Sequence, residues 1–158
     1  YQGTEMDIEK ILGVSFESGK HGIKGEHRSK INGNIKKSLD FDRTFNRGND
    51  NPWDYLLESN DAYPFVEVHP AKSGGNLDEV FSKLKWMRDW IIKHKNYKEL
   101  RKEKSRFIWL HTGGFNIQYT PRDPKVRALS SAKIKFPPQG VVDCDRLEYF
   151  TLQQILNI

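Results

Sequence analysis

The sequence has almost no cysteine and no long apolar segment. Cys144 is the only cysteine among 158 residues, which excludes an intramolecular disulfide framework and a cysteine-based zinc cluster. No apolar run approaches the ~18 residues of a membrane-spanning helix, and no apolar stretch typical of a secretory leader is visible. We therefore expect no membrane partner and a cytoplasmic or otherwise intracellular location.

The sequence also lacks the short motifs of several enzyme classes. Gly113-Gly114 is not followed by the Lys-Ser/Thr pair of a phosphate-binding loop, so nucleotide binding of that kind has no support. No Gly-x-Ser-x-Gly elbow occurs, and Cys144 has no neighbouring histidine or base in the sequence. Nucleophilic catalysis therefore has no candidate residue.

The charged residues are unevenly spread along the chain. The net charge is +5, yet residues 93–135 alone carry twelve Lys or Arg against three Asp or Glu. Such a segment attracts polyanions, although a solvated surface that keeps a protein soluble has the same composition. We interpret it as a surface that holds a nucleic-acid backbone, DNA or RNA, without reading its bases. The candidate contact residues are Lys93, Lys95, Arg101, Lys102, Lys104, Arg122, Lys125 and Arg127.

The hydrophobic pattern predicts one α/β domain over residues 1–158, with a mixed central sheet and helices on both faces. Residues 1–50 form a partly helical, irregular N-terminal arm, residues 51–135 the core, and residues 136–158 the C-terminal strands or helix. The predicted helices cover residues 6–14, 26–39, 76–97 and 123–133. The predicted strands cover residues 53–58, 64–69, 106–111, 115–119, 141–144 and 147–152, with a terminal helix over 152–158 as the alternative to the last strand.

The first two core strands form a hairpin whose register brings acidic residues together. If the turn is centred between Asn60 and Asp61, Asp54 lies opposite Glu67, and alternation places His69 on the same face. Opposed like charges destabilise a sheet, so two facing carboxylates favour a divalent cation such as Mg²⁺ or Mn²⁺ between them. The alternatives are a solvated sheet edge, or a Lys or Arg partner elsewhere in the chain.

The spacing of Asp54 and Glu67-Val68-His69 resembles the motif of the PD-(D/E)xK nuclease superfamily, the restriction-endonuclease-like fold. The resemblance covers roughly residues 50–112, in the order hairpin, helix, strand. It implies a restriction-endonuclease-like core in which Asp54 and Glu67 bind Mg²⁺ or Mn²⁺, with the carbonyl of Val68 as a third ligand. A glutamate from a preceding helix often completes such sites, and Glu26 or Glu17 is the candidate here.

The sequence departs from the family motif at two positions. Trp53, rather than proline, precedes Asp54, and His69 occupies the position of the family's lysine. An imidazole suits a general base at neutral pH but carries no fixed positive charge. Lys72, in the following loop, is the candidate to replace that charge. The catalytic residues we expect are therefore Asp54, Glu67, His69 and Lys72.

These observations lead to two hypotheses of different classes. The first is a metal-dependent nuclease that hydrolyses phosphodiester bonds of nucleic acid. The second is a catalytically inactive module on the same scaffold that binds nucleic acid or a protein. A purely structural domain is a third possibility that the sequence leaves open.

Three further groups of residues have weaker patterns. His21 and His27 with Glu26 match no zinc spacing, and His111 ends a strand, where a structural role is the commoner explanation. Trp86 and Trp90 lie four residues apart on the long helix. They either widen its buried face or form an exposed platform for a partner or for nucleobases.

Overall fold

The structure is a computed structural model that describes residues 7–158, and a six-stranded mixed sheet lies at its centre. The strand order is β1-β3-β4-β5-β6-β8, and neighbours run antiparallel except β5 and β6, which are parallel. The expected mixed α/β architecture is therefore confirmed. The strands are β1 (Glu17–Ser18), β3 (Ile35–Asp40), β4 (Tyr55–Ser59), β5 (Tyr63–Val68), β6 (Lys104–Leu110) and β8 (Phe150–Thr151).

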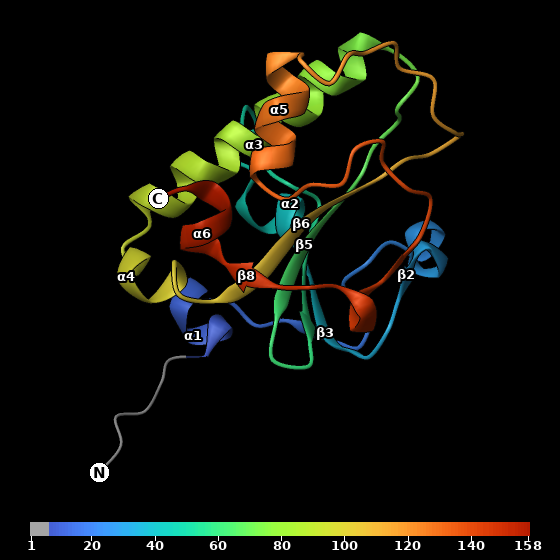
Figure 1. Cartoon of the computed structure of the whole chain (residues 1–158). Helices are drawn as coiled ribbons and strands as arrows, with labels where there is room; N and C mark the ends of the chain where they lie inside the picture. The colour runs from blue at the N-terminus through green and yellow to red at the C-terminus, as the bar shows by residue number, and fades with distance from the viewer. Residues whose placement is uncertain (1–6) are drawn as a thin grey trace.

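Most helices lie on one face of the sheet, with α3, α5 and α6 together on that side (Figure 1). Beneath them Phe65 of β5 stacks on Phe107 of β6 with ring centroids 4.8 Å apart, and Trp53 meets Phe107 edge-on. Burial of these rings holds the layer to the sheet. The helices are α1 (Ile8–Leu12), α2 (Phe41–Phe45), α3 (Gly74–Lys93), α4 (Tyr97–Leu100), α5 (Pro124–Ser131) and α6 (Leu152–Leu156).

The opposite face of the sheet has its own apolar cluster, which includes Tyr55, Val66 and Ile108. Its members outside the central sheet come from the loop residue Ile23, a small parallel pair of strands and a 3₁₀ helix, and no α-helix among residues 7–158 contributes to it. The short elements on this side are η1 (Gly25–Lys30), which has no buried residue, β2 (Ile31–Asn32), β7 (Val142–Asp143) and η2 (Cys144–Arg146). Helices were expected on both faces of the sheet, but the helical elements on this second face are short 3₁₀ turns.

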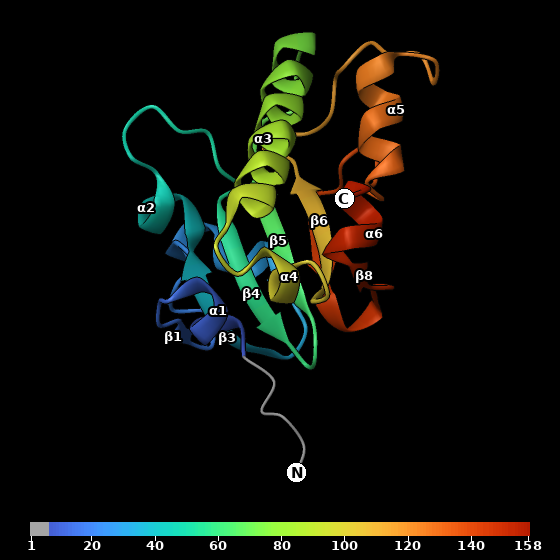
Figure 2. The same cartoon turned by 90° about the vertical axis from the view of Figure 1, so that its left-hand side faces the viewer.

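The helix α3 connects β5 to β6 and lies across the sheet (Figure 2). Its buried residues recur with helical spacing, which explains why the segment forms an amphipathic helix; they are Leu77, Val80, Leu84, Met87 and Ile91. The helix begins at Gly74 with Ser73 as its N-cap, two residues before the expected start, and ends at Lys93. Within the described chain no helix is both long and apolar enough to cross a lipid bilayer.

Two sequence predictions are wrong. Residues 26–39 form no α-helix but a 3₁₀ turn followed by β2 and β3, and Gly33 between those strands has a φ of 109° that a helix does not allow. Residues 115–119 form no strand, and only Phe115 makes an isolated bridge, to Ala71. β3 is hydrogen-bonded to β4, so the segment expected to be an N-terminal arm supplies part of the central sheet.

The remaining elements agree with expectation within a few residues. The strand expected over 106–111 is β6, and the helix expected over 123–133 is α5, capped by Asp123 with Pro124 in its first turn. At the C-terminus both alternatives occur, because β8 is followed directly by α6. The hairpin register is confirmed: Leu56 pairs with Phe65, and Tyr55 with Val66.

Candidate functional site

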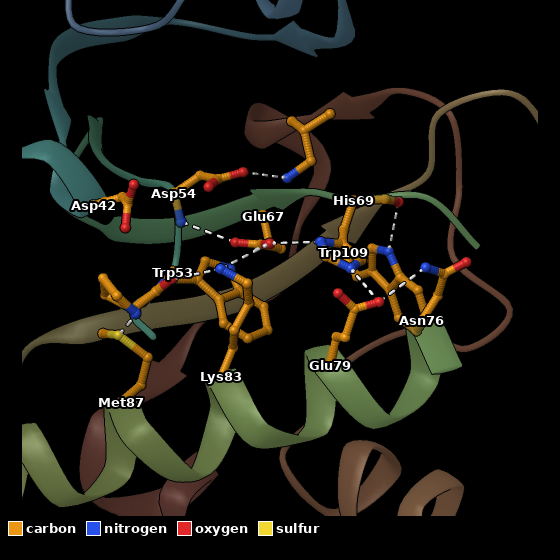
Figure 3. A network of polar contacts seen from close by, with 12 residues as sticks. Asp42, Trp53, Asp54, Glu67, His69, Asn76, Glu79, Lys83, Met87 and Trp109 are labelled. Carbon is orange, nitrogen blue, oxygen red and sulfur yellow. Dashed lines mark hydrogen bonds and ion pairs between the residues drawn. The ribbon is translucent and has the colours of Figure 1, made fainter. Parts of the chain in front are cut away.

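The candidate site lies at the open end of the β4–β5 hairpin. Asp54 directly precedes β4, and Glu67 is the penultimate residue of β5. The backbone N–H of Asp54 donates to Glu67 Oε1 at 3.0 Å, and the N–H of Val68 donates to Asp54 Oδ2 at 3.0 Å (Figure 3). Each carboxylate is therefore bound to the backbone of the other strand, which fixes the two residues side by side.

The two carboxylates do not point in the same direction. Glu67 points toward α3, whereas the Asp54 carboxylate turns to the backbone of β5 at Val68 (Figure 3). The expectation that Asp54 shares one face with Glu67 and His69 is thus corrected. The reason is that β4 begins only at Tyr55, so strict strand alternation does not extend to the residue before it.

Glu67 is 1% exposed, and its negative charge is matched by two neighbours. His69 Nδ1 lies 3.2 Å and Lys83 Nζ 3.4 Å from Glu67 Oε2. Lys83 also donates to the carbonyl of Pro52 at 2.9 Å, which anchors its ammonium under the hairpin. A buried carboxylate needs such partners, and Lys83 is the cationic partner that the sequence left open as an alternative.

His69 is held by contacts on several sides. Its Nε2 lies 3.4 Å from Glu79 Oε1 of α3, and its carbonyl accepts from Trp109 Nε1 at 3.0 Å. Glu79 is in turn bound by the side-chain amide of Asn76 at 3.1 Å. The hydrogen bond to Glu67 raises the pKa of His69 above its ordinary value, and Glu79 adds to this effect. These contacts therefore orient the imidazole, and its raised pKa favours the protonated form.

The proximity of the two carboxyl groups changes the acidity of Asp54. Burial, and then the negative charge of Glu67, raise the pKa of Asp54 to about 7. The amide of Val68 and the ammonium of Lys83 oppose this effect without cancelling it. A cation bound next to both carboxyl groups would relieve this repulsion.

The donor chemistry suits a hard divalent cation. Residues 7–158 contain no cluster of three or more His, Cys, Asp or Glu side chains arranged for a metal. Mg²⁺ commonly binds through one or two carboxylates and keeps several waters. Asp54 and Glu67 supply that number of carboxylates, although the two point in different directions here. Val68, between Glu67 and His69, remains the candidate for a backbone ligand.

Lys83 and Glu79 were not identified as site residues from the sequence. Their spacing of four residues places them on one side of α3, and this was the only signal available. Lys72, expected to replace the family's lysine, lies instead with its ammonium against Gly113 in the loop after β6. The fixed positive charge beside Glu67 comes from Lys83.

The other sequence candidates lie in separate environments. His27 Nδ1 pairs with the hydroxyl of Tyr55 at 2.7 Å, and burial lowers the pKa of His27. Glu26 lies in η1, and Glu17 lines a hollow next to His21. None of these side chains makes a hydrogen bond or ion pair with Glu67 among the described residues.

Two further candidates have structural surroundings. The ring of His111 packs near Gly140, and the backbone N–H of His111 donates to the carbonyl of Gln139 at 3.0 Å. Cys144 is fully buried, which raises the pKa of its thiol to about 12. A thiol of that acidity is not a nucleophile at neutral pH.

The expected nucleic-acid contacts divide between two parts of the molecule. Lys93 and Lys95 lie at the C-terminal end of α3, and Arg101, Lys102 and Lys104 follow α4 into β6. Arg122, Lys125 and Arg127 belong to the start of α5, where Lys125 forms an ion pair with Asp78 near the start of α3. The basic segment of the sequence is therefore not one continuous patch.

No protein-family model matches the chain, and no curated protein or solved structure matches it either.

Proposed function

We propose that this protein is a metal-dependent nuclease that hydrolyses phosphodiester bonds of nucleic acid. The observation that carries the proposal is the joint presence of Asp54, Glu67, His69 and Lys83 at one end of the hairpin, with Glu67 as their common centre. Such a group combines two acidic ligands, a base and a fixed positive charge. These are the components that phosphodiester hydrolysis requires.

Each side chain has a distinct role in the proposal. Asp54 and Glu67 would hold a divalent cation, which would neutralise charge at the phosphate and lower the pKa of a water. His69, oriented by Glu67 and Glu79, accepts the proton of the attacking water in its uncharged form, so cleavage requires a pH above the raised pKa of His69. Lys83 offers its ammonium to the negative charge that develops on the phosphate in the transition state.

The arrangement of elements around the site supports the same proposal. The hairpin β4–β5, the helix α3 and the strand β6 follow one another, and β6 pairs in parallel with β5. This is the order hairpin, helix, strand on which the resemblance to the restriction-endonuclease-like core rests. The substitution of His69 for the family's lysine is compensated in the proposal by Lys83, which comes from the helix instead of the strand.

The test is cleavage of labelled DNA and RNA, single- and double-stranded, by purified protein with Mg²⁺ or Mn²⁺. We expect activity that Glu67→Gln reduces by at least about 100-fold, since Glu67 binds both the cation and the base. The matched control is Glu99→Gln, an exposed glutamate of α4, which should cleave like the wild type. Equal cleavage by Glu67→Gln and by the control would place the activity elsewhere.

A second candidate function is a non-catalytic module that binds nucleic acid. The observation that favours it is the ion pair of Lys83 with Glu67, which neutralises the buried carboxylate without a cation. Thermal denaturation with increasing Mn²⁺ distinguishes the two functions. The nuclease requires that Mn²⁺ raise the melting temperature of the wild type and of Glu99→Gln but not of Glu67→Gln, and the module requires no Mn²⁺ effect on any of them.

A further inference from the structure

One side of α3 extends from the candidate site to the far end of the helix. Glu79 and Lys83, which contact His69 and Glu67, are followed at helical spacing by Trp86 and Trp90. Residues separated by three or four positions lie on the same face of an α-helix. The distance from Lys83 to Trp90 along the helix axis is about 10 Å at 1.5 Å per residue.

The two tryptophans form a nearly parallel pair on this side of the helix. Their ring planes differ by 16°, and the centroids are 6.4 Å apart. Trp90 is fixed from behind by Phe41 and Phe45 of α2, at centroid distances of 5.1 and 5.0 Å. His94 also contacts Trp90, in a tilted arrangement with a centroid distance of 5.0 Å. The aromatic surface is therefore rigid before any ligand arrives.

The hydrophobic core does not bury Trp86 and Trp90 completely. Both rings are only half-buried, and they line a hollow of about 550 Å³. The hollow is lined by Trp86, Asp89, Trp90, Lys93, His94 and Lys95. It thus combines two aromatic faces with two ammonium groups, against one carboxylate, and contains no aliphatic side chain.

This composition selects among ligands. An aliphatic peptide side chain would find no aliphatic wall, and the lysines add nothing to its binding. A nucleobase stacks on an indole while the phosphates beside it are attracted by ammonium groups, which is how proteins hold single strands. In a duplex the faces of the bases are covered by their neighbours, so the ligand must be an unpaired base.

We propose that Trp86 and Trp90 stack an unpaired base of the nucleic acid whose backbone lies at Glu67 and Lys83, with Lys93 and Lys95 beside its phosphates. The inference rests on the proposed function and narrows its substrate to single-stranded or locally unpaired nucleic acid. The axial spacing of about 10 Å between Lys83 and Trp90 brings the tryptophan pair within reach of a strand whose backbone lies at Glu67 and Lys83.

The test is binding of a fluorescein-labelled 15-nucleotide single strand and of its duplex, followed by anisotropy with EDTA present so that no cleavage occurs. The variants are Trp86→Ala, Trp86→Phe and, as control, Tyr119→Ala, whose aromatic ring lines a different hollow. We expect Trp86→Ala to weaken single-strand binding about tenfold, and Trp86→Phe and the control to bind like the wild type. Circular dichroism establishes that each variant is folded.

Three results would overturn the inference: equal single-strand affinity of Trp86→Ala and the wild type, tighter binding of the duplex than of the single strand, or no binding at all. Cleavage assays distinguish a failure of the stacking site from a failure of the proposed nuclease activity. Cleavage that depends on Glu67 but not on Trp86 leaves the nuclease intact and removes the stacking site. Binding that depends on Trp86, without cleavage under any metal, would support the stacking site and contradict the nuclease activity.

Discussion

At the scale of single residues, the protein is defined by a buried carboxylate with two basic neighbours. Glu67 is almost inaccessible to solvent, and Lys83 and His69 both lie within ion-pair distance of its Oε2. Burying an ionised group is costly unless it is paired, so replacing Glu67 and Lys83 together by neutral side chains is expected to be tolerated better than removing the lysine alone.

The first stability prediction concerns this ion pair. Lys83→Met leaves the Glu67 charge without its ammonium and should lower the free energy of unfolding by about 3 kcal/mol. The double variant Glu67→Gln/Lys83→Met should be more stable than Lys83→Met alone, because no unpaired charge remains. Urea denaturation of the variants, with the exposed Lys85→Met as control, measures both effects. A double variant that loses the sum of the two single effects would show that the pair is not coupled.

The second prediction concerns the acidity of Asp54. Its pKa in the folded protein is raised to about 7, above the ordinary value of 3.8, chiefly by burial and next by the charge of Glu67. The folded state therefore binds more protons than the unfolded state between these values, and stability falls as the pH rises from about 4 to 7. Asp54→Asn retains an acceptor for the Val68 amide but cannot ionise.

The measurement is urea denaturation of the wild type and Asp54→Asn at several pH values between 4 and 8. The stability of Asp54→Asn relative to the wild type should increase up to about pH 7 and then stay constant. A difference that does not change with pH would mean that Asp54 keeps its ordinary acidity in the folded protein.

At the scale of elements, the hairpin was predictable and the strand beside it was not. The register followed from a short turn at Asn60, whose φ of 53° asparagine tolerates better than most residues, and from hydrophobic strands on either side. The sequence of β3 contains two lysines, which are compatible with a helix and interrupt the alternating pattern of a strand. Its pairing with β4 is a tertiary contact. Local pattern cannot report such a contact.

The same distinction applies to the candidate site. Asp54, Glu67 and His69 came from the hairpin register, which local sequence determines. Lys83 lies sixteen residues after Glu67 on another element, and its approach depends on how α3 packs on the sheet. The sequence showed a lysine on the polar side of a helix, which is where solvated lysines also occur.

The third prediction concerns the start of α3. The Asn76 side-chain oxygen accepts from the N–H groups of Lys72 and Ser73 at 2.9 and 3.2 Å, and its amide binds Glu79. Asn76→Ala removes these hydrogen bonds and should lower the free energy of unfolding by about 1 kcal/mol. Ser82→Ala, an exposed position in the middle of the helix, should change it by less than about 0.5 kcal/mol. Equal effects in thermal denaturation would show that Asn76 does not stabilise the helix start.

At the scale of the whole molecule, one sheet carries two different surfaces. The first half of α3 carries Glu79 and Lys83 beside the candidate site, and its second half carries the tryptophans that line the hollow. The basic segment of the sequence is divided between the two ends of α3, a division that depends on the fold. In the proposed function, the long helix connects the hydrolytic centre with the surface that holds the strand.

The central claim, a divalent cation at Asp54 and Glu67, is tested most directly by soaking crystals in Mn²⁺ and collecting anomalous diffraction. We predict an anomalous peak in contact with the carboxylates of Asp54 and Glu67 in the wild type, and no peak there in crystals of Glu67→Gln. Wild-type crystals without anomalous density at these carboxylates, and with Glu67 still paired with Lys83, would contradict the account.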